Sequence, residues 1–292
     1  MTIAACFLLP EGVILAADST TTQITPMPPR TGGAPQAPVV RYFLYGQKLF
    51  EIGENSTLGI VTWGLGGLPD LSYRTVIASF ADSLRAAPPG SMQEVAQKWG
   101  EYFWAAYSKS LAAEIQAAKQ LSETPPVEPG LVEIRTQLVR RTSVGFCVAG
   151  RCGESRQPSA FRVDVSPLLP GPPTPHPLPM GDLQFWGVPN MVNRLALGFD
   201  QEIVTALLRS GKWGGTPQEL VAVLTERVLQ LPRIMPLRDA IELVHSLIYT
   251  TIKSMKYSHL PPVCGGPIEI AVITTDRNFR WVKHKPFDVA LD

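Results

Sequence analysis

The stretch MTIAACFLLPEGVILAADS, residues 1–19, decides how the rest of this 292-residue chain is interpreted. Residues 3–9 are apolar throughout, Pro10-Glu11-Gly12 has the chemistry of a turn, and residues 13–17 form a second apolar run rich in β-forming side chains. The pattern predicts a β-hairpin with both arms buried. A strand that starts this early leaves no room for a signal peptide, so we expect a cytoplasmic protein.

The hairpin places a hydroxyl at one end and a carboxylate at the other. Thr2 would become the first residue once Met1 is removed, and its side chain is small enough for ordinary methionine removal. An N-terminal threonine can act as a nucleophile with its own α-amine as the base. We therefore expect Thr2 to be the nucleophile of a catalytic site, with Asp18 brought back towards it by the second arm.

Composition excludes several other classes of function. Hydrophobic residues make up 45% of the chain and the net charge is +1, which indicates a globular protein without affinity for nucleic acid or an anionic membrane. No apolar run approaches the roughly 18–20 residues of a membrane span. The four cysteines are scattered through apolar stretches, which is typical of reduced thiols, and no metal or other cofactor is expected because no His or Cys pair has ligand spacing.

The order of the expected elements is strands, two helices, strands, three helices and strands. Antiparallel sheets covered by helices fit this order better than a parallel sheet does. Because both strand blocks are apolar on both faces, we predict the α+β class, with a four-layer αββα sandwich of two stacked antiparallel sheets flanked by helices. One domain would span residues 1–292, with proline-rich surface insertions near 20–39, 122–130 and 167–181.

The individual elements follow from apolar periodicity and turn residues. Strands are expected at 3–9, 13–17, 40–45, 47–52, 58–63, 143–149, 160–165, 183–187, 268–274 and 280–283. Helices are expected from Pro69 to about residue 84, and at about 92–121, 191–208, 218–229 and 238–253. Residues 20–39 carry too many prolines to join a strand ladder, so we expect an extended surface segment there.

Two further features could converge on Thr2 and Asp18 in such a sandwich. An N-terminal threonine needs a cation that lowers the proton affinity of its amine, which Lys48 could supply. It also needs amide donors for the oxyanion, which the glycine turn Gly64-Leu65-Gly66-Gly67 could supply. The same turn is close to a dinucleotide-binding fingerprint, but Pro69 occupies the third glycine position and antiparallel hairpins precede it.

Taken together, these motifs resemble a known family. Thr2-Ile3, then GVILAADS at 12–19, Lys48-Leu49 and a glycine turn ending at Asp70 are similar to the opening of proteasome β-type subunits and their bacterial relatives, the HslV and Anbu peptidases. A helix at 240–252, Tyr257-Ser258 and the strand GGPIEIAVIT at 265–274 resemble the end of that family. The resemblance covers most of the chain and implies the fold of N-terminal nucleophile (Ntn) hydrolases.

The resemblance also implies a role for each matched residue. Thr2 would be the nucleophile of a threonine-type endopeptidase, Asp18 would hold Lys48, and Lys48 would lower the pKa of the Thr2 amine. Gly66 would give the oxyanion-binding amide, with Gly64 as the alternative. Ser258 matches a supporting serine near the amine.

Two departures from the family pattern leave the function open. Met255 stands where active members carry a supporting Asp, and Val188 stands where a serine is expected. The alternatives to a peptidase are therefore a weakly active or inactive proteasome-like scaffold or binding subunit, and an Ntn amidase of small molecules. For any of these, the resemblance implies a homo-oligomeric ring or spiral. For the peptidase it implies peptide or unfolded protein as substrate, and it leaves room for an ATPase regulator.

Overall fold

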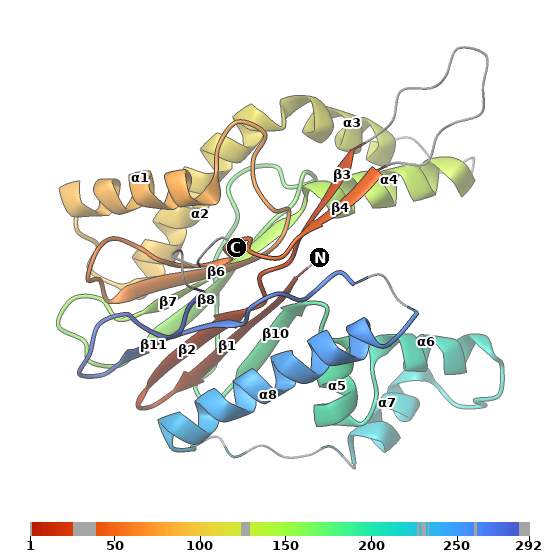
Figure 1. The fold of residues 1–292 in the computed structure, drawn as a ribbon. Helices are drawn as coiled ribbons and strands as arrows, with labels where there is room; N and C mark the ends of the chain where they lie inside the picture. The colour runs from red at the N-terminus through yellow and green to blue at the C-terminus, as the bar shows by residue number, and fades with distance from the viewer. Residues whose placement is uncertain are drawn as a thin grey trace, which may run out of the picture.

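Two antiparallel sheets stack face to face in the computed structural model, which describes residues 2–25, 39–123, 129–226, 228, 232, 234–259 and 262–285. Each large sheet has five strands. Helices α1 to α4 cover one outer face and α5 to α8 cover the other (Figure 1). The predicted αββα sandwich is confirmed.

The first sheet is built around the opening hairpin, in the strand order β10-β1-β2-β11-β12. Every residue of β1 and β2 is buried, because one face of the hairpin packs on the second sheet and the other on α8. The strands of this sheet are β1 (Ile3–Leu9), β2 (Gly12–Ala17), β10 (Leu183–Gly187), β11 (Glu269–Thr274) and β12 (Arg280–Lys283).

The second sheet has the order β5-β6-β7-β8-β9. Its strands are β5 (Leu49–Glu51), β6 (Leu58–Gly64), β7 (Val144–Gly150), β8 (Ser159–Val165) and the two-residue β9 (His176–Pro177). The region 167–181, expected as an exposed loop, thus contributes a short edge strand, which pairs with Phe161 and Arg162 of β8.

A separate two-stranded sheet corrects the expectation for residues 20–39. Strand β3 (Thr21–Thr25) pairs with β4 (Val39–Phe43), so the segment does begin with a strand ladder. The prolines do not oppose this pairing, because every one of them lies at 26–38, outside the described residues.

The helices differ in several places from the sequence prediction. They are α1 (Tyr73–Ala86), α2 (Met92–Ser110), α3 (Ala112–Glu123), α4 (Pro129–Thr142), α5 (Asn190–Leu197), α6 (Gln201–Arg209), α7 (Pro217–Thr225) and α8 (Leu237–Lys256). The first begins at Tyr73 rather than Pro69, because the Ser72 side chain caps it by accepting from the Thr75 N–H. Helix α4 was not predicted.

Two expected long helices are each divided. The helix expected at 92–121 breaks at Leu111, the C-cap of α2. The helix expected at 191–208 breaks at Gly198, which ends α5 in the left-handed conformation with φ +81. Asp200 then caps α6 by accepting from the Ile203 N–H at 2.8 Å.

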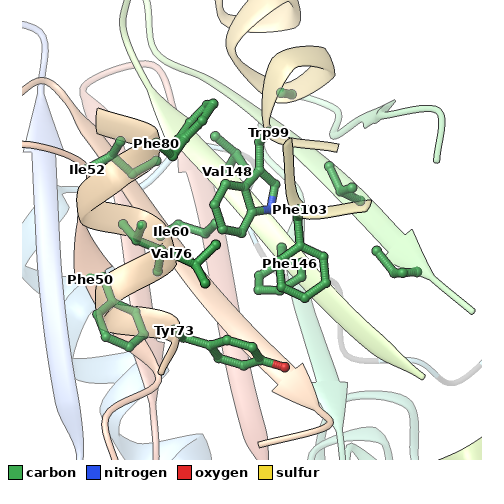
Figure 2. Packing of buried hydrophobic residues seen from close by; sticks show 14 of the residues in the cluster. Phe50, Ile52, Ile60, Tyr73, Val76, Phe80, Trp99, Phe103, Phe146 and Val148 are labelled. Atoms are coloured by element: carbon green, nitrogen blue, oxygen red, sulfur yellow. The ribbon is translucent and has the colours of Figure 1, made fainter. Parts of the chain in front are cut away.

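The core has three layers. Aromatic side chains fill the space between α1, α2 and the second sheet, where Trp99 lies 5.0 Å from Phe146 and 5.2 Å from Phe80 between ring centroids (Figure 2). Alanine, aliphatic and cysteine side chains fill most of the layer between the sheets, together with aromatic residues such as Trp186, and aliphatic side chains of α8 cover the hairpin. Within the described residues, no helix combines the length and apolar character needed to cross a bilayer.

Candidate active site

The Asp18 carboxylate is the centre of the candidate site. Asp18 directly follows β2 and is fully buried. Its Oδ1 accepts from the Ile3 N–H at 3.1 Å and from Lys48 Nζ at 2.6 Å. Its Oδ2 accepts from the Thr20 N–H at 3.1 Å and the Gly265 N–H at 2.8 Å. Four donors thus converge on one carboxylate, which compensates for the loss of its hydration.

Lys48 reaches Asp18 from the other sheet. It directly precedes β5 and is 6% exposed, and its backbone carbonyl accepts from the Thr62 N–H of β6 at 2.9 Å. Burial lowers the pKa of the Lys48 ammonium, and the charge and hydrogen bond of Asp18 oppose that shift. The predicted contact between Asp18 and Lys48 is therefore present, and it joins the two sheets at one end of the sandwich.

Thr2 lies at the same end, before the first residue of β1. It is 5% exposed and lines a cavity of about 40 Å³ together with Lys48 and Gly66. Gly187 of β10, which pairs with Ile3, makes this position possible. Its φ is +90, and a Cβ there would lie 1.8 Å from the Thr2 carbonyl oxygen.

The glycine turn forms another wall of the cavity. Gly64 has φ +90, and a Cβ on it would lie 2.5 Å from the Ser143 carbonyl oxygen, so glycine is required there for backbone approach. The next amide, that of Leu65, donates to the same Ser143 oxygen at 2.9 Å. No backbone carbonyl of the described residues accepts from the Gly66 N–H. Both glycines line the cavity, but they differ in their surroundings. The backbone of Gly64 lies close against Ser143 and Val144 at the start of β7, whereas Gly66 is not confined by that strand.

The other three positions singled out in the sequence lie around α8 and β10. Ser258 follows α8, is exposed, and donates to the Met255 carbonyl oxygen at 3.2 Å. Met255 and Val188 are both buried in the apolar cluster between α8 and the first sheet. The Met255 sulfur lies 3.2 Å from Cys264 Sγ. These two side chains serve packing in this structure.

Sequence reasoning missed two residues of the site, Gly265 and Thr20. Gly265 supplies one of the donors to Asp18, and its carbonyl accepts from the Ser19 N–H at 3.0 Å. Thr20 is 1% exposed and lines the cavity, and its hydroxyl has no hydrogen-bond partner among the described residues. Neither residue has a local sequence signal, because each acts through the neighbour to which the fold brings it.

Cys264 is an alternative nucleophile by position but not by chemistry. It precedes Gly265 and is 3% exposed. Burial, followed by the nearby negative charge of Asp18, raises the pKa of the Cys264 thiol to about 12. The thiol is therefore protonated at neutral pH, and the reactive thiolate is not formed. All four cysteines are free.

Comparison with known proteins supports the fold. No family model and no curated protein matches this chain. The fold of this chain is similar to that of a protein of known structure, which has an Ntn-hydrolase fold. The predicted fold class is thereby confirmed. That protein is an Anbu (Gly-1) mutant from Hyphomicrobium sp. strain MC1, with a TM-score of 0.51, 13% sequence identity, and coverage of 98% of this chain and 89% of the other. The predicted likeness to Anbu is thus confirmed at the level of the fold.

Proposed function

We propose that this chain is a threonine-type amide hydrolase of the proteasome kind, which cleaves peptide bonds in peptides or unfolded protein. Thr2, freed by removal of Met1, is the nucleophile. The observation that carries the proposal is the Asp18 carboxylate, whose Oδ1 accepts both from Lys48 Nζ and from the N–H of Ile3, the residue next to Thr2. The Asp18 carboxylate thus holds both the Lys48 ammonium and the backbone next to Thr2, and Lys48 and Thr2 line the same cavity.

The chemistry follows from these positions. Thr2 Oγ1 attacks the substrate carbonyl carbon while the Thr2 α-amine accepts the hydroxyl proton. The Lys48 cation favours the neutral form of that amine, because a nearby like charge disfavours protonation. The Gly66 N–H donates to the oxyanion of the tetrahedral intermediate. The leaving amine takes the proton, and water then hydrolyses the threonine ester.

The test combines mass and covalent labelling. The intact mass and N-terminal sequence of the native protein should show Thr2 as the first residue, and an epoxyketone or β-lactone should label it. Thr2→Ala should abolish labelling, whereas Thr205→Ala, on the surface of α6, should leave the rate unchanged. Retention of Met1, or equal labelling of wild type and Thr2→Ala, would remove Thr2 from the mechanism.

A second candidate function is a proteasome-like scaffold or binding subunit without activity. The packing of Met255 and Val188 in the apolar cluster favours it, because neither side chain can hydrogen-bond to the amine or its proton. Thr2 would then be an ordinary buried residue. Retained Met1 together with an absence of labelling would decide for this function.

We also propose that the chain assembles with copies of itself, as the proteasome resemblance implies. The exposed apolar run along β4 and the residues after it supports self-association, because large side chains are exposed there: Val39, Val40, Tyr42, Phe43, Leu44 and Tyr45. Sedimentation of the purified chain tests the proposal. A monomer at micromolar concentration would contradict it.

A further inference from the structure

A second buried ion pair lies beside the first. Lys285, which follows β12, is 5% exposed, and its Nζ lies 2.9 Å from Oε2 of Glu269, a fully buried residue at the start of β11. The proposed chemistry uses neither residue. Two buried charges are retained at a large desolvation penalty, so their contacts need an explanation.

The remaining contacts of Lys285 lead to the candidate site. Its Nζ donates to the Gly46 carbonyl at 3.0 Å and lies 3.5 Å from the Ser19 hydroxyl oxygen. Ser19 is next to Asp18, and Gly46 lies two residues before Lys48. The Gly46 N–H also donates to the Ser19 carbonyl at 2.8 Å. One ammonium therefore joins the segment that carries the catalytic carboxylate to the segment that carries the catalytic cation.

Glu269 anchors this ammonium to the first sheet. It pairs with Ala17 in the ladder between β11 and β2, one residue before Asp18. His284 Nδ1 lies 2.7 Å from Glu269 Oε1, and the His284 ring stacks on Trp281 at 4.0 Å. The charged groups around Lys285 are thus Glu269, in direct contact, and, further away, Lys48 with its partner Asp18. The titratable ring of His284 lies against Glu269.

We propose that Lys285 is a positioning residue for the Asp18–Lys48 pair, acting through Ser19 and Gly46 and anchored by Glu269. Its importance for catalysis rests on the proposed function, whereas its effect on the geometry of Asp18 does not. The four charges balance, with two carboxylates and two ammonium groups. The positive charge of Lys285 also lowers the pKa of Lys48, although less than burial does.

The experiment removes the whole pair, so that no unpaired charge stays buried. Glu269→Gln/Lys285→Met is compared with Lys285→Arg, which keeps the charge, and with Lys283→Met, an exposed lysine two residues earlier whose Nζ contacts His245. Amide hydrogen exchange resolved by NMR reports on the N–H groups that donate to Asp18, those of Ile3, Thr20 and Gly265.

We expect the double variant to fold. The protection factors of these three amides against hydrogen exchange should fall by about tenfold or more, while those of the α2 amides should not change. Lys285→Arg, which keeps the charge, should retain most of the wild-type protection at these amides, and Lys283→Met should retain all of it. Unchanged protection in the double variant would overturn the proposal.

Labelling of Thr2 by a β-lactone separates this proposal from the proposed function. In the double variant the maximal labelling rate should fall about tenfold with unchanged affinity, because Ser19 and Gly46 are no longer joined by the Lys285 ammonium. Lys285→Arg, which keeps the charge, should retain most of the wild-type rate. A wild-type labelling rate in the double variant would overturn the catalytic part of the proposal. If the wild type is not labelled, the proposed function fails, and the exchange measurement still decides whether Lys285 positions Asp18.

Discussion

Replacing Asp18 by Asn should destabilise the fold by an amount that its hydrogen bonds set. Asn offers one carbonyl oxygen and one NH₂ group where the carboxylate offers two acceptors. If the NH₂ faces Ile3 and Lys48, the buried ammonium loses its counter-ion, at a cost of about 3–5 kcal/mol. If it faces Thr20 and Gly265, two buried N–H groups lose their acceptor, at about 1–3 kcal/mol each. Because Asn is neutral, the Lys48 ammonium loses its counter-ion in both orientations, so we expect a loss of at least about 3 kcal/mol in the free energy of unfolding.

Urea denaturation at neutral pH measures this loss by linear extrapolation. Tryptophan fluorescence is a suitable signal, because Trp63 of β6 and Trp186 of β10 stack at 4.4 Å between the two sheets. Lys48→Met in the Asp18→Asn background should recover part of the loss, giving a coupling free energy of about 1–3 kcal/mol. A loss below about 1 kcal/mol for Asp18→Asn, or strict additivity of the two substitutions, would refute the ion pair as the organising contact.

Two further substitutions test the same end of the sandwich. Because the pKa of Lys48 is lowered on folding, the unfolded chain binds more protons below the ordinary lysine pKa, so the contribution of Lys48 to stability rises with pH there. The stability of wild type relative to Lys48→Met should therefore increase from about pH 8 to about pH 10, and a constant or falling difference in urea denaturation would contradict this. Gly187→Ala should destabilise at least about twice as much as Gly198→Ala. Both residues have positive φ, but only at Gly187 would the Cβ also overlap the Thr2 carbonyl, and equal losses of unfolding free energy would show that Thr2 moves freely.

Much of the fold was predictable because both sheets are buried on both faces. A continuous apolar run bounded by turn residues identifies such strands, and β1, β2, β6 and β7 lie within a residue or two of their expected bounds. Helix α4 was missed because Pro129 was interpreted as part of a chain break, although proline is favoured in the first turn of a helix. The break between α5 and α6 did have a signal, because Gly198 is a typical C-cap.

The candidate site was predictable where residues near in space share a motif. Asp18 and Lys48 were expected to meet, and they do. The contacts of Gly265, Thr20 and the Lys285–Glu269 pair were not found, because the resemblance assigned these residues no role and the sequence alone does not show which strand they will face. The packing of Met255 and Val188 was also beyond reach, since the sequence identifies the side chain but not its neighbours.

The position of β1 has a consequence for synthesis of the chain. The hairpin is synthesised before its partner strand β10, which follows more than 170 residues later, and the Gly265 amide that completes the Asp18 contacts is 247 residues away from Asp18. A nascent chain therefore carries Thr2, Asp18 and Lys48 long before they can be held together. Any reactivity that depends on these contacts is therefore delayed until Gly265 has been synthesised.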